Sequence, residues 1–359
     1  MDRMVKVLVV DDSAFMRKLI TDILTSEENI EVIGTARNGS DCLVKLQTLK
    51  PDVITMDVEM PIMNGIEALK EVISLYRLPV VMLSSTTGDG EKNTILAMQY
   101  GAVDFITKPS GSISLDLEKI KDEIVTKVLQ ASKANISNLL KPLKTTNLSY
   151  NKGKGTSLKG LIKDVNLVHK KLVCIGTSTG GPRALQQVLT KLPSQFPAPI
   201  LIVQHMPAGF TNSLAKRLNA LCNIEVKEAE DGEIVREGTA YIAPGGFHLK
   251  VKEIENSIIL YLENSEPRNG HRPSVDVMFE SLSKLQDYLK LAIVMTGMGA
   301  DGSKGLVALK NNGNTSIIAE SEKTAVIFGM PKVAIETNLV DIVADLEDIS
   351  DFIIKSTGN

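Results

Sequence analysis

The chain of 359 residues is long enough for two or three domains, and its 43% hydrophobic content is sufficient for packed cores. No stretch approaches the ~18 consecutive apolar residues of a membrane span, and the short N-terminal apolar run is followed too soon by acids to be a signal peptide. The net charge of −3 and three widely spaced cysteines (Cys42, Cys174 and Cys222) disfavour a nucleic-acid-binding protein, a zinc site and a disulfide framework. These features predict a cytoplasmic protein that does not insert into a membrane.

The first 110 residues or so alternate short apolar runs with helical patterns. Strands are predicted at 5–10, 53–56, 80–83 and 104–107, and helices after Ser13 and at 40–49, 64–76 and 91–100. This alternation predicts a parallel sheet with helices on both faces. The carboxyl ends of its strands share one edge, where ligands bind.

Acidic residues gather at that edge. Asp11 and Asp12 follow the first strand, and Asp57 follows the strand at 53–56. Three neighbouring carboxylates repel one another, so a divalent cation such as Mg²⁺ is expected among them. Lys108, after the strand at 104–107, adds a positive charge.

Three motifs resemble those of a response-regulator receiver domain: Val-Val-Asp-Asp-Ser, Met-Asp-Val-Glu-Met-Pro-Ile-Met-Asn-Gly and Lys-Pro. The resemblance implies a flavodoxin-like domain over residues 1–125, with Asp57 as phosphoacceptor and Asp11, Asp12 and Asp57 as Mg²⁺ ligands. It also implies that Lys108 contacts the phosphoryl group and that Ser84 and Phe105 are switch residues. An aspartyl phosphate adds negative charge and acceptor oxygens that such residues can follow.

Residues 126–168 are predicted to be a lysine-rich linker. The stretch 126–171 contains ten lysines and one acid, a charge of +9 that leaves −12 for the remainder of the chain. Residues 147–160 are rich in Ser, Thr, Asn, Gly and Lys, which is typical of linkers. Two acidic domains joined by a basic segment are poorly suited to bind nucleic acid.

Residues 169–359 form the second predicted domain. Strands are expected at 172–175, 200–203, 241–243, 291–295 and 316–319, and helices at 183–192, 211–221, 275–285 and 302–311. The region 225–262 is predicted to form short strands joined by turns, including a hairpin. This order predicts a second doubly wound α/β domain with an antiparallel hairpin.

Ser178 stands in Gly-Thr-Ser-Thr-Gly, between the strand at 172–175 and the helix that begins near Pro182. This G-x-S-x-G arrangement exposes a serine oxygen beside free amides and a helix N-terminus, so the serine can attack a carbonyl carbon. A glycine-rich turn with a capping serine is the alternative interpretation.

A serine nucleophile needs a general base and a group that orients it. Of the four histidines, His205 directly follows a predicted strand and is favoured, whereas His169 lies at the linker's end and His248 and His271 lie in the loop-rich middle. Asp301 follows the strand at 291–295 and is the candidate acid. It could also cap the helix that comes after it, and the two roles are compatible.

The same loop supports a competing interpretation. Gly297, Gly299 and Gly302 match the dinucleotide-binding pattern G-x-G-x-x-G, and Glu320 lies at a suitable distance beyond for a ribose ligand. Asp301 argues against it, because a carboxylate would stand inside the loop that must receive an anionic pyrophosphate.

Four further motifs resemble the effector domain of the chemotaxis methylesterase (CheB) family: Gly-Thr-Ser-Thr-Gly-Gly, Gln-His-Met-Pro, His-Arg-Pro-Ser-Val-Asp and Met-Thr-Gly-Met-Gly-Ala-Asp-Gly. With the receiver in front, the resemblance covers essentially the whole chain. It implies Ser178 as nucleophile, His205 as base and Asp301 as third member, with the backbone amides of Thr179 and Met298 as oxyanion hole.

The family resemblance implies hydrolysis of glutamate γ-methyl esters on the cytoplasmic helices of chemoreceptors, with release of methanol, and deamidation of specific glutamines. It implies activation by phosphorylation from a chemotaxis histidine kinase. Mg²⁺ is expected in the receiver only, and no cofactor for the esterase reaction. The competing hypothesis is a non-enzymatic response regulator whose second domain binds a nucleotide or another partner.

Overall fold

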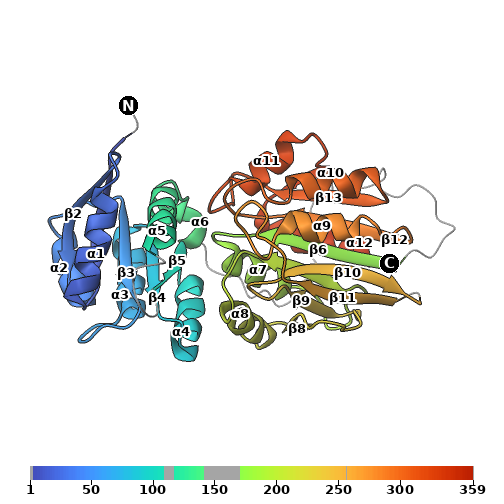
Figure 1. Cartoon of the computed structure of the whole chain (residues 1–359), viewed down its shortest axis with the longest axis horizontal. Helices are drawn as coiled ribbons and strands as arrows, with labels where there is room; N and C mark the ends of the chain where they lie inside the picture. Colours follow the sequence, from blue (N-terminus) through green and yellow to red (C-terminus); the bar gives the residue numbers. More distant parts are fainter. Residues whose placement is uncertain (1–2, 109–116, 141–169, 256, 359) are drawn as a thin grey trace. The chain divides into compact units, whose positions relative to one another are not determined.

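The computed structural model describes residues 3–108, 117–140, 170–255 and 257–358 (Figure 1). The chain divides into two units. The first comprises Met1–Lys141 with Ala325–Ile327, and the second comprises Pro142–Thr324 with Phe328–Asn359.

The first unit is built on a five-stranded parallel sheet in the order β2-β1-β3-β4-β5. Its strands are β1 (Val5–Val10), β2 (Ile30–Ala36), β3 (Val53–Asp57), β4 (Val80–Ser84) and β5 (Asp104–Thr107). Its helices are α1 (Ala14–Thr25), α2 (Gly39–Leu46), α3 (Gly65–Glu71) with the π-helical turn η1 (Val72–Tyr76), α4 (Gly88–Gln99), α5 (Leu117–Ala131) and α6 (Ile136–Leu140). Helices α1 and α5 pack together on one face, and α2, α3 and α4 follow one another on the other.

The predicted fold of this unit is confirmed, and its elements form for the expected reasons. The apolar strand β1 is buried from Val7 to Val10, as a strand covered on both faces requires. Ser13 caps α1 by accepting the Met16 N–H, and α1 buries Ile20 and Leu24. Strand β2 was not among the predicted elements. It lies at the sheet's edge and is largely half-buried, so its sequence lacks a continuous apolar run.

The second unit has a seven-stranded parallel sheet in the order β14-β13-β12-β6-β7-β9-β8 and a separate antiparallel pair β10-β11. Its strands are β6 (Lys170–Thr177), β7 (Ile200–Gln204), β8 (Glu225–Glu228), β9 (Thr239–Ile242), β10 (His248–Ile254), β11 (Ser257–Glu263), β12 (Tyr288–Val294), β13 (Thr315–Glu320) and β14 (Ile342–Ala344). Its helices are α7 (Gly181–Leu189), α8 (Phe210–Asn219), α9 (Val275–Leu282), α10 (Ser303–Asn311), α11 (Met330–Glu336) and α12 (Leu346–Thr357).

The order of the strands creates a switch point between β6 and β12. From β6 the chain builds outward through β7 to β9 and β8, and it then returns to the other side of β6 with β12, β13 and β14. Helices α7, α8 and α12 cover one face, whereas α9 and α10 cover the other and the β10-β11 hairpin packs on α9. The predicted doubly wound domain with an antiparallel hairpin is confirmed. In such sheets, ligands bind outside the carboxyl ends of the strands at the switch point.

The first predicted domain ends earlier in the chain than the first unit of the structure. The limit at 125 falls inside α5, which continues to Ala131, and the first unit extends to Lys141. The part of the predicted linker from 141 to 168 lies outside the described residues. Among the helices that the structure describes, none is long and apolar enough to cross a membrane.

Candidate active site and phosphorylation site

Ser178 lies in the turn between β6 and α7, at the switch point. Its backbone N–H donates to the Thr296 carbonyl at 3.0 Å, and its own carbonyl accepts the Gly181 N–H at 2.7 Å. Gly180 has φ of 78°, a left-handed conformation that glycine adopts without strain. A Cβ on Gly181 would stand 2.0 Å from Gln204 Oε1, so a side chain does not fit there. The two glycines therefore hold the serine against the start of α7.

His205 leaves the neighbouring strand at the same level as Ser178. The pairing of β6 with β7 sets Thr177 opposite Gln204, and the His205 N–H donates to the Thr177 carbonyl at 3.1 Å. The imidazole is buried, and its Nε2 lies 2.8 Å from Asp301 Oδ2. Its Nδ1 is also buried and has no hydrogen-bond partner among the residues described. One ring nitrogen is thus held by the acid, and the other is available as a base.

Asp301 is buried but surrounded by donors. Its carboxylate accepts the Ser274 hydroxyl at 2.8 Å and the backbone N–H groups of Val275 at 2.7 Å and Asp276 at 3.1 Å, in addition to the bond with His205. Burial disfavours the charged form, but the bonds from His205 and the two amides hold the pKa of Asp301 below its ordinary value. Asp301 is therefore ionised at neutral pH.

The structure corrects one expected role of Asp301. It does not cap α10, the helix that follows it, because the N-cap position there is Gly302 and has no side-chain bond. Instead the carboxylate bonds the first turn of α9, which begins at Val275.

His271, one of the lower-ranked histidines, stacks on His205. The two ring centroids are 3.8 Å apart and the planes are inclined by 11°. A tight turn holds His271 in place, since its N–H and carbonyl exchange hydrogen bonds with Arg268. Arg268 in turn makes a two-pronged ion pair with Glu280, at 2.7 and 2.9 Å. The stack fixes the plane of the His205 ring from its face, and Asp301 fixes it from its edge.

One predicted oxyanion donor follows the serine in the chain, and the other lies in a loop that packs on the serine. Thr179 follows Ser178 directly and is buried. Met298 follows Gly297, whose backbone packs on the serine so closely that a Cβ on Gly297 would lie 2.8 Å from Ser178 Cβ. The loop after β12 is thus in contact with the loop after β6.

The other predicted candidates lie elsewhere. His248 is buried, and its Nε2 lies 3.1 Å from the Glu266 carbonyl, so it belongs to the hairpin's packing. His169 lies outside the described residues. The dinucleotide interpretation is not supported, because Glu320 is completely buried and cannot reach a ribose, while Asp301 is occupied by His205 and α9.

In the first unit, the structure brings the three predicted acids together. The β1-β3 register sets Val10 opposite Met56, so Asp11 and Asp57 are at the same level of the sheet edge. One carboxylate oxygen each from Asp11, Asp12 and Asp57 lies within 4.8 Å of the others.

Lys108 joins this cluster. Its Nζ lies 2.9 Å from Asp11 Oδ2 and 2.8 Å from Asp57 Oδ2. Burial raises the pKa of Asp57 to about 6, aided by the charge of Asp11 and opposed by Lys108. Although burial also opposes the charge of Lys108, its contacts with Asp57 and Asp11 raise the pKa of its amine.

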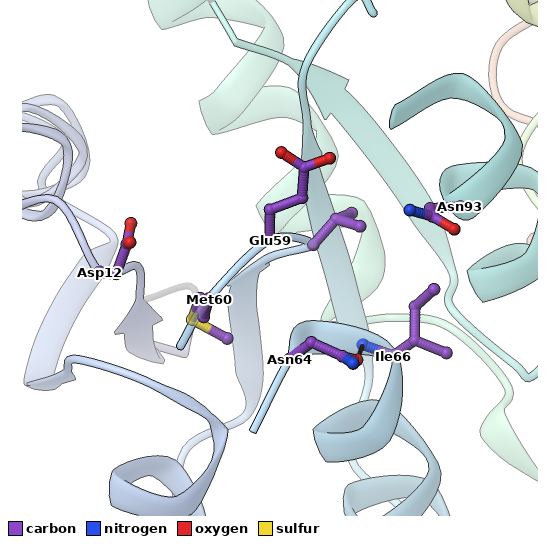
Figure 2. Close-up of a pocket in the computed structure, with 7 residues that line it drawn as sticks. Asp12, Glu59, Met60, Asn64, Ile66 and Asn93 are labelled. Atoms are coloured by element: carbon purple, nitrogen blue, oxygen red, sulfur yellow. Dashed lines mark hydrogen bonds between the residues drawn. The ribbon is translucent and has the colours of Figure 1, made fainter. Parts of the chain in front are cut away.

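The donor set fits a magnesium ion. Three carboxylates against one ammonium leave an excess of negative charge, and carboxylate oxygens are the ligands that Mg²⁺ prefers. A hollow of about 460 Å³ opens beside the cluster, lined by Asp12 and by Val58 and Glu59, which follow Asp57 in the chain (Figure 2). Met60, Asn64, Ile66 and Asn93 complete its wall. Of the three acids, Asp12 lines this hollow.

The two predicted switch residues are both buried. The Ser84 hydroxyl lies 3.3 Å from the Gly90 carbonyl and accepts a hydrogen bond from the Thr94 hydroxyl, so it faces the start of α4. Phe105 lies in β5 with Lys127 Nζ 5.2 Å from its ring centroid. Their role as switches stays a prediction.

Comparison with known proteins gives matches over both units. Residues 173–353 match the family described as CheB methylesterase, and residues 7–119 match the response regulator receiver domain. A protein-glutamate methylesterase/protein-glutamine glutaminase of Halalkalibacterium halodurans is 59% identical over 355 residues, 99% of each chain, and one of Geobacillus kaustophilus is 54% identical over 354 residues, again 99% of each. The crystal structure of the Thermotoga maritima CheB methylesterase catalytic domain is similar at 44% identity and a TM-score of 0.51, over 53% of this chain and 100% of that one.

Proposed function

The chain belongs to the CheB methylesterase family, and from this membership we propose which of its residues carry out the reaction. The protein is a phosphorylation-regulated protein-glutamate methylesterase and protein-glutamine glutaminase of chemotaxis. Its substrates are chemoreceptors, and its phosphodonor is a histidine kinase. We assign Ser178 as nucleophile, His205 as base and Asp301 as the acid that orients it. The 2.8 Å contact of His205 with Asp301, on the strand beside Ser178, supports this assignment most directly.

The proposed reaction follows from the charge state of Asp301. An ionised carboxylate can only accept, so Nε2 of His205 carries the proton and Nδ1 is the base. Nδ1 takes the Ser178 proton as the serine oxygen attacks the ester carbonyl, and a tetrahedral oxyanion forms. The N–H groups of Thr179 and Met298 are assigned to bind that oxyanion.

The intermediate then collapses. His205 returns its proton to the leaving methoxide, and methanol departs to leave a glutamyl ester on Ser178. Water, deprotonated by His205, hydrolyses this ester and restores the serine. With a glutamine substrate the leaving group is ammonia, and the remaining steps are the same.

For the receiver, we propose Asp57 as phosphoacceptor and Asp11, Asp12 and Asp57 as the residues that hold Mg²⁺. A bound Mg²⁺ would neutralise charge on the transferred phosphoryl group. Lys108, between Asp11 and Asp57, is placed to contact that group, and Ser84 and Phe105 are assigned to respond to it.

The test is methanol release from methylated receptor by the full chain. Wild type is compared with Ser178→Ala and Asp57→Asn, each with and without a small phosphodonor and Mg²⁺. We expect Ser178→Ala to abolish turnover, and Asp57→Asn to keep basal turnover but lose the stimulation. A chelator should likewise remove the stimulation and leave the basal rate.

Two results would contradict the assignment. Turnover by Ser178→Ala would exclude this serine as nucleophile. Stimulation that persists in Asp57→Asn or with the chelator would exclude Asp57 or the divalent cation from the activating step.

A further inference from the structure

Glu320 is a fully buried carboxyl group close to the active site, and the mechanism above gives it no part. It is the last residue of β13 and is 0% exposed. Its Oε2 accepts the Thr296 N–H at 2.8 Å, and its Oε1 accepts the Thr324 hydroxyl at 3.0 Å. Burying a carboxyl group costs free energy of folding. Here the buried group bonds the loop after β12, which packs on Ser178.

Thr296 connects Glu320 to the nucleophile. It lies just beyond β12 and is itself fully buried. Its carbonyl accepts the Ser178 N–H at 3.0 Å and the Thr177 hydroxyl at 2.9 Å. Its hydroxyl donates to the Thr179 carbonyl at 2.9 Å. Glu320 thus fixes one end of a residue whose carbonyl and hydroxyl bond the end of β6 and the loop after it.

These bonds hold the backbone on either side of the first proposed oxyanion donor. Thr296 bonds the Ser178 N–H and the Thr179 carbonyl. The Thr179 N–H, the first proposed donor, lies between these two groups along the backbone. The second proposed donor, the N–H of Met298, is two residues after Thr296 in the same loop. Thr296 therefore bonds the loop that carries the serine and the first donor, and it lies in the same loop as the second donor.

We propose that Glu320 is a positioning residue for the esterase reaction: through Thr296 it holds Ser178 and the two oxyanion amides in their reactive arrangement. The inference rests on the proposed roles of Ser178, Thr179 and Met298. Glu320 acts as a hydrogen-bond acceptor, so a neutral acceptor of the same shape serves in its place.

The electrostatics of the site agree with this role. Burial raises the pKa of Glu320 to about 7, although the bonds from Thr296 and Thr324 favour the charged form. The charges of Glu347 and Asp345 add to the increase. The carboxyl group is therefore substantially neutral near pH 7, where it still accepts the Thr296 N–H.

The experiment compares kcat and KM for methanol release from methylated receptor by the full chain. Glu320→Leu, which removes the acceptor, should lower kcat by ~100-fold with little change in KM, because a misplaced oxyanion hole affects the transition state alone. Glu320→Gln should stay within about 5-fold of wild type, because its amide oxygen accepts the Thr296 N–H. Thr296→Val, which removes the hydroxyl bond to Thr179, should lower kcat by ~10-fold.

Thr239→Val is the matched control. Thr239 is a buried threonine at the start of β9, and its hydroxyl lies 3.4 Å from Glu225 Oε2. This substitution makes the same change in a strand on the other side of β6 in the same sheet, and kcat should stay within about 2-fold. If Glu320→Leu does not fold, Glu320→Met, which fills a similar volume without the acceptor, takes its place, and the comparison of Thr296→Val with Thr239→Val tests the bond from Thr296 to Thr179.

The outcomes separate this inference from the assignment of the nucleophile, which Ser178→Ala tests in the same assay. Wild-type kcat in folded Glu320→Leu, or equal kcat for Thr296→Val and Thr239→Val, would overturn the positioning role. So would a loss in Glu320→Gln as large as in Glu320→Leu. An increase in KM without a fall in kcat would also overturn it, since that pattern indicates substrate binding.

Discussion

Replacing Glu320 by glutamine should make the protein's stability less dependent on pH. In the folded chain, burial raises the pKa of this carboxyl group from 4.5 to about 7. Glutamine keeps the shape and the acceptor for Thr296 but has no proton to lose. The pH dependence of the difference in unfolding free energy between variant and wild type therefore reports the ionisation of Glu320.

The size and sign follow from the two pKa values. The folded state binds the Glu320 proton more tightly than the unfolded state, so this contribution to stability is fully present below pH 4.5 and is lost as the pH rises through about 7. At 1.36 kcal/mol per pKa unit, the full loss is about 3 kcal/mol. Between pH 5 and 8, Glu320→Gln should gain about 2 to 3 kcal/mol relative to wild type.

Calorimetric unfolding of the full chain across this pH range measures the effect. For a unit of this size the gain corresponds to a relative increase in Tm of about 5 to 10 °C. The same substitution at the exposed Glu322 controls for the loss of one carboxyl group. A difference between Glu320→Gln and wild type that stays constant within about 0.5 kcal/mol from pH 5 to 8 would refute the reasoning.

Two further predictions concern the histidine. Asp301→Asn should lower kcat by ~10³-fold or more, because one amide cannot accept both the His205 N–H and the backbone amides of α9. Initial rates of methanol release measure this loss. A loss below 10-fold would contradict the proposed role of Asp301. His271→Ala should lower kcat by about 2- to 10-fold because it removes the ring stacked on His205, whereas His271→Phe should retain most of the rate. Equal rates in the two His271 variants would show that the stack does not contribute.

Much of both folds could be predicted because most of the apolar strands are followed in the chain by a proposed reactive residue or a helix. Asp57, Ser178 and His205 each stand at or next to the carboxyl end of a buried strand, and parallel pairing brings such positions to one edge. The elements after β13 were not predicted. Strand β14 has three residues and is partly exposed, so its periodicity is too short to recognise.

The glycine pattern after β12 shows why the sequence left two functions open. Gly297 is required for close packing on Ser178, whereas Gly299 and Gly302 have φ of 80° and 97°. These requirements produce the spacing G-x-G-x-x-G without any dinucleotide. Glu320 fits the expected place of a ribose ligand, and only its complete burial shows otherwise.

The stack of His271 on His205 had no sequence signal of its own. It depends on the turn that begins at Arg268, and on the ion pair of Arg268 with Glu280 in α9. His205 and His271 are far apart in the chain, and the residues next to each of them in the sequence do not predict that the two rings meet. The position of His271 could be determined only once the ion pair of Arg268 with Glu280, which holds this loop, was known.

The bonds of Asp301 to the start of α9 also bear on where charge resides during the reaction. The amino end of a helix carries a partial positive charge, and here it lies against the carboxylate. When His205 becomes an imidazolium, the dipole of α9 continues to favour the anion on Asp301, so the proton stays on the ring and the pair remains separated into two ions. A helix outside the proposed catalytic residues thereby contributes to the electrostatic field around them.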